Sequence, residues 1–281
     1  MSDFPDIGFQ PALLTIAPLP RTKVGTHFKR MVPGGMVSYF ALEEIPHTTV
    51  DRRIAALLVT LSKRTGKKRV SVDSVEEFLR EYMGQDARGG VRGNIGSVSK
   101  AIRRMATTAV AIEEGVSHDG LRAMAGRGIF TLASGYQILW AGGRFKNAIV
   151  QPGLLDSLTY FEWSVEAHKW LVESAVPFDL RVGMSIRGEL ANDLYHMINR
   201  RNYAMHQQGK TEHHIEWKGL YAQYGQNGGI LNESQMKSFR RTFKAALDEV
   251  PGQGFVVDEK GLHLVKTPLI VDPEAKTTGY L

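Results

Sequence analysis

Four basic side chains recur on one face of a predicted helix near the carboxyl end of the chain: Lys237, Arg240, Arg241 and Lys244. Their steps of three and four residues place them on one side of an α-helix. Lysine and arginine in such a row can donate charge-assisted hydrogen bonds to phosphate oxygens, and arginine can also bind the edge of a guanine. An ordinary solvated helix surface has the same composition. The neighbouring elements therefore decide between the two interpretations.

The helix that carries this basic row also has an apolar face beside it. The apolar positions again follow steps of three and four: Met236, Phe239, Phe243, Leu247 and Val250. Asn232 is a suitable amino-terminal cap, with Gln235 three residues later as in a capping box, and Pro251 stops the helix. The sequence thus predicts one helix over 232–250 that is buried on one face and cationic on the next.

The segments on either side of this helix predict a winged helix-turn-helix. Residues 254–258 and 261–265 alternate in polarity and are joined by a turn at Lys260, which is typical of a β-hairpin. Before the helix, residues 214–217 are typical of a short strand and 218–224 of a short helix. In this order the long helix can enter a major groove while the hairpin lies along the DNA backbone. Lys260, at the predicted tip, is then a candidate phosphate ligand.

The first half of the chain repeats the same order of elements. The pattern Lys100-x-x-Arg103-Arg104 recurs 137 residues later in the long basic helix. We expect these side chains to lie beside the buried stripe of a helix over 94–107. The other elements expected in this half are a helix over 48–64, a strand over 70–72, a helix through residue 82, and strands over 109–116, 128–140 and 146–150. A shared order with matches at one offset indicates two copies of one module.

These elements predict an α+β fold of tandem winged-helix domains. The expected division is an extended amino-terminal arm over 1–33, a first module over 34–153, a helical join over 154–175, a second module over 176–268 and a tail over 269–281. The arm is rich in proline and basic residues. A strand or tail packed on the first module is the favoured alternative to an arm that contacts DNA. The aromatic residues of the join are interpreted as packing residues.

Composition restricts the class of protein. Of 281 residues, 43% are hydrophobic, which is enough for a core in each of two domains. Lys and Arg exceed Asp and Glu by 35 to 29, giving a net charge of +6 and an isoelectric point near 9.4, which favours polyanionic partners. The absence of cysteine excludes disulfides, thiolate metal sites and cysteine nucleophiles. No secretory signal or membrane-length apolar run is recognisable, so we expect a cytoplasmic protein without membrane contact.

The sequence lacks the usual signals of nucleotide or metal binding. No phosphate-binding Gly-rich loop is present, and no cofactor is expected. His213 and His214 are adjacent on a predicted strand, where neighbouring side chains point to opposite faces. These two histidines therefore cannot chelate one metal ion together.

Glu216 and Lys218 have the spacing of a carboxylate and a lysine in some metal-dependent nucleases. Such sites also need a second acidic group to hold Mg²⁺. Asp179 and Asp193 are available in the sequence, but both are expected on helical starts or faces. We therefore predict no catalytic and no metal-binding residues, and we interpret this segment as the polar face of a strand that leads into a short helix.

Two segments of the second module resemble a known family. Residues 215–225, with a tryptophan and an aromatic-glycine end, and residues 239–247, with the pattern Phe-x-x-x-Phe-x-x-Ala-Leu, are similar to the carboxyl-terminal region of plasmid-encoded RepA-type replication initiators. The resemblance extends upstream through 176–180 and 190–203, and more loosely towards the amino end. The join over 154–175 is longer than the family pattern.

The resemblance implies that the chain binds direct repeats in double-stranded DNA at a plasmid origin and promotes opening of the adjacent duplex. It also implies recruitment of host replication proteins, such as the replicative helicase and the host initiator. On that analogy the DNA-binding side chains are Lys237, Arg240, Arg241 and Lys244 in the second module, and Lys100, Arg103 and Arg104 in the first. The location implied is the bacterial cytoplasm, on plasmid DNA.

The same fold leaves other functions open. A winged-helix transcriptional repressor is the nearest alternative, because contacts in a groove do not distinguish starting replication from blocking a promoter. A metal-dependent nuclease or nicking enzyme is the third. The sequence determines neither the target bases, nor the host factors, nor the choice between a monomer and a homodimer.

Overall fold

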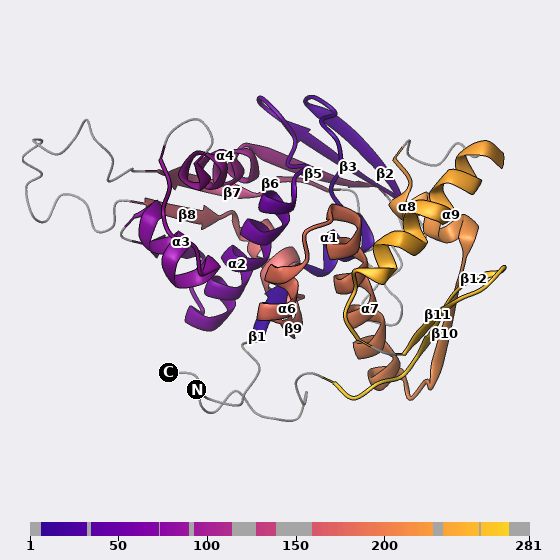
Figure 1. Cartoon of the computed structure of the whole chain (residues 1–281). Helices are drawn as coiled ribbons and strands as arrows, with labels where there is room; N and C mark the ends of the chain where they lie inside the picture. The colour runs from indigo at the N-terminus through magenta and orange to yellow at the C-terminus, as the bar shows by residue number, and fades with distance from the viewer. Residues whose placement is uncertain are drawn as a thin grey trace, which may run out of the picture.

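The computed structural model describes residues 7–32, 35–72, 74–89, 93–113, 128–138, 159–226, 233–252 and 254–269. Its helices and strands form two similar modules, the first on the left and the second on the right in Figure 1. A four-stranded sheet runs along the top of that view. None of the described helices combines the length and the apolar composition that crossing a membrane requires.

The second module is a winged helix, as predicted. A strand, two helices and a hairpin follow in order: β10 (Glu212–Glu216), α8 (Trp217–Tyr224), α9 (Glu233–Asp248), β11 (Phe255–Val257) and β12 (Gly261–Val265). The strands pair antiparallel in the order β10-β12-β11, so the last strand of the wing is central. The preceding helix, α7 (Glu189–Gln208), packs against α9. The predicted cap, Asn232, lies outside the described residues.

The first module has the same order of elements. These are α2 (Thr49–Thr65), β4 (Arg69–Val72), α3 (Val75–Met83), α4 (Asn94–Ala106), β7 (Ala133–Gln137) and β8 (Thr159–Trp163). Its sheet order, β4-β8-β7, matches β10-β12-β11. Thr48 and Asp51 form a capping box at the start of α2, and Gly66 ends that helix in the left-handed conformation. The tandem winged-helix fold is therefore confirmed.

The stretch over 128–140, expected as one strand, contributes to two sheets. β6 (Gly128–Thr131) pairs with β5 (Thr108–Glu113), and these two strands join β2 (His27–Val32) and β3 (Gly35–Ala41) in the order β2-β3-β5-β6. β7 pairs instead with β8 in the first module's own sheet. Leu132, between β6 and β7, is buried. The strand predicted over 146–150 lies outside the described residues.

The helical join predicted over 154–175 is wrong in part, because residues 159–163 form β8, the central strand of the first module's sheet. Burial alternates along this strand, with Phe161 and Trp163 in the core. That period of two is the pattern of a strand, whereas its aromatic content suggested helical packing. A short helix, α5 (Val165–Ala167), and a π-helical segment, η1 (His168–Glu173), follow it. The first module therefore continues past residue 153.

The extended arm predicted over 1–33 is folded throughout its described residues. β1 (Ile7–Gln10) pairs antiparallel with β9 (Val176–Asp179), α1 (Ala12–Ile16) is buried along its length, and β2 joins the four-stranded sheet. The apolar side chains of α1 enter the common core, which stabilises the folded conformation over an extended one. The packed alternative is correct, and the packing involves both modules, because β1 contacts α2 while α1 contacts α7.

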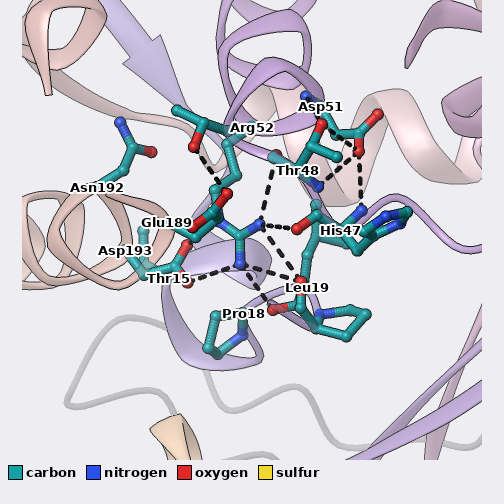
Figure 2. A network of polar contacts seen from close by, with 12 residues as sticks. Thr15, Pro18, Leu19, His47, Thr48, Asp51, Arg52, Glu189, Asn192 and Asp193 are labelled. Carbon is teal, nitrogen blue, oxygen red and sulfur yellow. Dashed lines mark hydrogen bonds and ion pairs between the residues drawn. The ribbon is translucent and has the colours of Figure 1, made fainter. Parts of the chain in front are cut away.

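A buried ion pair joins the two modules. Arg52 on α2 donates from Nε to Asp193 Oδ1 on α7 (2.7 Å) and from Nη2 to Asp193 Oδ2 (2.8 Å), and both side chains are almost inaccessible to solvent. The same guanidinium donates to the carbonyl oxygens of Leu19 and His47 (Figure 2). It also donates to the carbonyl oxygen of Pro20. One side chain thereby connects α2, α7, the amino-terminal segment and the loop before α2.

Further polar contacts between α2 and the start of α7 surround this pair. The Thr49 hydroxyl lies 2.9 Å from the Arg187 carbonyl oxygen and 3.1 Å from a Glu189 carboxylate oxygen. Arg53 donates to the Ile186 carbonyl oxygen at 2.9 Å. The buried apolar side chains of both modules and of the amino-terminal segment belong to one continuous core. The modules therefore form one body, in which their relative orientation is fixed.

Asp193→Ala should lower the free energy of unfolding by about 3–5 kcal/mol, because it leaves the buried Arg52 guanidinium without its counter-charge. Chemical denaturation followed by circular dichroism measures this loss. Arg181→Ala is the control, since it removes an exposed arginine from a long ion pair with Asp179 (3.7 Å) and should cost less than about 1 kcal/mol. Equally small losses in both variants would contradict a structural role for the buried pair.

Candidate nucleic-acid interface

α9 presents its four predicted cations to solvent. All of them are exposed: Lys237, Arg240, Arg241 and Lys244. The apolar face of the helix is buried at Phe239, Phe243 and Leu247, and Met236 is half-buried. Two neighbouring stripes, one buried and one cationic, were predicted from the spacing and are present in the structure.

The cations of α9 differ in their surroundings. Lys237, Arg241 and Lys244 form no ion pair with any residue in the described part of the chain. Arg240 instead lies over an aromatic ring, with its guanidinium carbon 5.2 Å from the centre of the Trp217 ring. α9 is the second helix of the helix-turn-helix, the position from which such folds contact the major groove. Its unpaired charges are therefore available to an anionic ligand.

An aromatic cluster fixes the angle between α8 and α9. The Trp217 ring meets Phe243 edge-on with centroids 5.4 Å apart, and Tyr221 meets Phe239 edge-on at 5.1 Å. Phe239 and Phe243 are themselves 5.5 Å apart. Edge-to-face contacts of this kind restrict ring orientation and add to the stabilisation from burial. The exposed face of α9 is therefore held in a defined direction.

The wing is tied to the start of α8. Asp258 Oδ1 accepts backbone hydrogen bonds from Lys260 (2.7 Å) and Gly261 (2.9 Å). Both bonds lower the pKa of Asp258, and the bond from Gly261 has the larger effect. The backbone N–H of Trp217 donates to the Lys260 carbonyl oxygen (3.2 Å), and its indole Nε1 donates to the Asp258 carbonyl oxygen (3.2 Å). The Lys260 side chain is exposed at the tip, as predicted.

Trp217 therefore links the two parts of the interface, because it supports Arg240 on α9 and holds the wing turn. In the sequence it was noted only as part of a family motif. A buried tryptophan usually donates its indole N–H to an acceptor. Its place at the junction of a strand and a helix was the signal for this positioning role.

The first module presents less free positive charge. Lys100 on α4 is exposed. Arg103 is also exposed, but it forms an ion pair with Glu43. Arg104 is held inside the protein: its side chain is only 14% exposed and it donates to Asp51 Oδ1 from Nε (3.0 Å) and Nη2 (2.8 Å). Of the three side chains predicted to bind DNA from α4, Arg104 thus has a structural role.

Glu44 completes the environment of Arg104. Arg104 Nη1 donates to Glu44 Oε2 at 3.1 Å, while Lys23 pairs with the other oxygen of that carboxylate at 2.9 Å. The pKa of Glu44 is lowered chiefly by this hydrogen bond from Lys23. The carboxylate therefore stays charged and holds the carboxyl end of α4 against the loop before α2.

The acidic residues considered for a nuclease site lie in different places. Asp193 is occupied by the buried pair with α2. Asp179 caps α6 (Leu180–Ser185) by accepting backbone hydrogen bonds in its first turn. Glu216 is exposed at the end of β10. The structural roles of Asp179 and Asp193 leave neither free to complete a metal site with Glu216.

The adjacent histidines of β10 point to opposite faces, as expected. His213 is half-buried, with Nε2 3.2 Å from an Arg201 side-chain nitrogen. His214 is exposed on the outer face of the sheet. The two side chains therefore do not share one ligand.

No protein-family model and no curated protein sequence matches the chain. Among solved structures, it is similar to a selenomethionine crystal structure of domain 2 and domain 3 of RctB, with a TM-score of 0.54 and 13% sequence identity over 93% of this chain and 97% of that chain. A second structure of RctB domains 2-3 aligns with a TM-score of 0.48 and 13% identity over 91% and 96% of the two chains. The first likeness covers nearly all of both chains and shows a shared two-module fold.

Trp217→Phe should leave the protein folded and loosen the wing, because phenylalanine keeps the aromatic packing but lacks the indole N–H that holds the Asp258 carbonyl oxygen. We expect a loss of about 1–3 kcal/mol in the free energy of unfolding. Hydrogen exchange should become faster in peptides that cover β11 and β12. Mass spectrometry after timed deuterium labelling measures this change.

Tyr221→Phe is the matched control for this experiment. It removes a hydroxyl from the same aromatic cluster, one that donates to Gln235 Oε1 at 3.0 Å and forms no hydrogen bond with the described residues of the wing. Exchange in the wing should stay unchanged in this variant. Equal acceleration in both variants would mean that Trp217 does not position the wing.

Proposed function

We propose that this chain is a DNA-binding replication initiator that binds direct repeats at a plasmid origin and promotes opening of the duplex beside them. The observation that carries the proposal is the exposed cationic face of α9, whose side chains Lys237, Arg241 and Lys244 have no internal counter-charge among the described residues. This face lies on the second helix of a winged helix-turn-helix, next to a wing that ends in Lys260. Such a surface suits a major groove and its flanking phosphates.

The arginines and the lysines of this surface are suited to different contacts with DNA. Arg241 can bind a guanine edge with two hydrogen bonds, whereas Lys244 and Lys260 are point charges suited to phosphates. Arg240, stacked on Trp217, is held in one orientation and can present its outer N–H groups to a base or to the backbone. Specificity therefore comes mainly from the arginines and salt-dependent affinity from the lysines.

The first module contributes a second contact. Lys100 and Arg103 lie exposed on α4, the helix that corresponds to α9. Because the modules form one body, one chain offers two groove contacts at a fixed angle. A covalent tether makes the second contact intramolecular, so both together bind much more tightly than either alone.

The following observations support the assignment as a plasmid replication initiator. The similar solved fold belongs to RctB, a replication initiator, and the motifs of the second module resemble RepA-type initiators. Asp179 and Asp193, the two aspartates considered as partners of Glu216 in a nuclease site, have structural roles, which favours action by binding rather than catalysis. A host helicase, a host initiator and a plasmid location belong to the proposal as well.

Substitutions on α9 and at the tip of the wing test the proposal. Arg241→Ala should weaken binding to an origin repeat by about 1–3 kcal/mol and relax the preference at one base pair. Lys244→Ala and Lys260→Ala should weaken all sequences alike, and each should reduce the slope of log affinity against log salt by about one. Fluorescence anisotropy titrations at several salt concentrations measure both effects.

Two controls separate DNA contacts from general charge and stability. Lys67→Ala removes an exposed charge from the loop after α2 and should leave affinity unchanged. Arg104→Ala removes the matching arginine of the first module and should lower the melting temperature instead, since that side chain bonds Asp51 and Glu44. Unchanged affinity in all the α9 and wing variants would show that the cationic face is merely solvated.

A footprint tests how the two modules are used. One chain should protect about two helical turns of an asymmetric repeat, because groove contacts on one side of a duplex lie about 10 to 10.5 base pairs apart. Nuclease protection together with the mass of the complex gives both the span and the stoichiometry. An obligatory dimer on a palindrome would instead favour the repressor alternative. Loss of plasmid maintenance in the Arg241→Ala variant would favour the initiator.

A further inference from the structure

The outer face of the second module's sheet brings together three side chains, from β10, the wing turn and β12. His214 on β10 lies opposite His263 on β12 in the antiparallel register. Leu262 and Leu264, on either side of His263, are buried in the core, so His263 must point outward. Asp258, at the start of the wing turn, extends to the same place. Sequence spacing concealed this group because its members lie on three different segments.

The donor atoms of the three side chains converge. One nitrogen from each of His214 and His263 and one oxygen from Asp258 all lie within 4.8 Å of one another. His263 Nε2 is 3.1 Å from Asp258 Oδ2, and the two imidazole rings have centroids 4.2 Å apart. A tetrahedral zinc ion with bonds of about 2.0–2.2 Å holds its ligand atoms roughly 3.3–3.6 Å apart. Small side-chain rotations would therefore bring all three donors to one ion.

The backbone prepares these donors before any ion binds. Asp258 Oδ1 is already used by the N–H groups of Lys260 and Gly261, which leaves Oδ2 directed at His263. The two histidines are fixed by the strand ladder between β10 and β12. His263 and Asp258 are 42% and 43% exposed, so a hydrated ion can reach them and keep a water ligand. The site thus needs little reorganisation.

The surrounding charge and the ligand types indicate the class of ion. Glu212 and Glu216 are exposed and share the outward face of β10 with His214, because successive strand residues alternate between faces. Their negative potential favours a cation. Imidazole ligands suit zinc, copper and nickel, whereas magnesium and calcium prefer oxygen ligands. Two histidines and one carboxylate therefore favour a divalent transition metal.

We propose that His214, His263 and Asp258 form a binding site for one divalent transition-metal ion, with zinc as the expected occupant and water in the fourth position. Such an ion would cross-link β10, β12 and the turn that carries Lys260, and so fix the wing relative to the sheet. The inference goes beyond the proposed function and does not depend on it, because metal binding can be measured without DNA. The alternative is a metal-free His263–Asp258 ion pair beside a stacked imidazole.

Metal titration of the full chain, prepared without a histidine tag and freed of metal by a chelator, tests the proposal. Zn²⁺ should bind with one equivalent per chain, measured against a chromophoric competitor, and Co²⁺ should give the visible absorption of a four-coordinate site. His214→Gln and His263→Gln should each weaken binding by more than about tenfold, since even the outer-shell partners of metal ligands contribute roughly 10- to 100-fold. Mg²⁺ should not compete.

Two further variants make the result decisive. Asp258→Asn keeps an oxygen that can accept the turn's backbone hydrogen bonds but removes the carboxylate, so it should weaken metal binding while the wing stays folded. His27→Gln removes an exposed histidine on β2, outside the cluster, and should leave binding unchanged. No binding of Zn²⁺ by the natural chain, or equal binding by the His214→Gln/His263→Gln double variant, would overturn the proposal. Circular dichroism confirms that each variant is folded.

Discussion

The relative placement of the two modules depends on the buried pair between Arg52 and Asp193. A guanidinium in a protein interior is tolerated only when its donors are paired, since desolvation of both charges is costly. Arg52 meets this requirement with one carboxylate on α7 and with backbone carbonyls from the amino-terminal segment and the loop before α2. Apolar packing between the helices allows several crossing angles, and the bidentate pair with its fixed partners favours the one seen in the structure.

The same amino-terminal segment also contacts the helix-turn-helix of the second module, at the end of α8. Directly after the carbonyls that Arg52 binds, Arg21 donates to the Tyr224 carbonyl oxygen at the end of α8 (2.8 Å), and Arg30 on β2 donates to Gly225. The Tyr224 hydroxyl in turn bonds the Thr15 carbonyl oxygen (2.9 Å). The end of α8 is thus fixed by the segment that completes the Arg52 network. Basic residues that composition alone would assign to a DNA-contacting arm are used inside the protein.

Local patterns predicted the elements whose partners lie close in sequence. The long basic helix, the wing hairpin and α2 follow from the spacing of residues within about twenty positions. The elements that sequence patterns misplaced form because they pair with strands far away in the sequence. β1 is a strand because β9 completes it, and β8 is the centre of a sheet because β4 and β7 flank it. The role of Arg104 could not be predicted either, because Asp51 is brought to it only by the packing of α2 on α4.

The two copies of the basic motif show how tertiary context changes the use of the same residue types. Arg104 and Arg241 occupy equivalent positions 137 residues apart, yet Arg104 pairs with Asp51 whereas Arg241 has no carboxylate partner among the residues that the structure describes. The residue at the same offset from Asp51 is Gly188, which has no side chain to offer. An arginine without a counter-charge is free for a ligand, whereas a paired one stabilises its own module. The chain therefore presents a strongly cationic helix at one end and a weakly cationic one at the other. Under the proposed function, the second module would make the stronger DNA contact and the first module the weaker one.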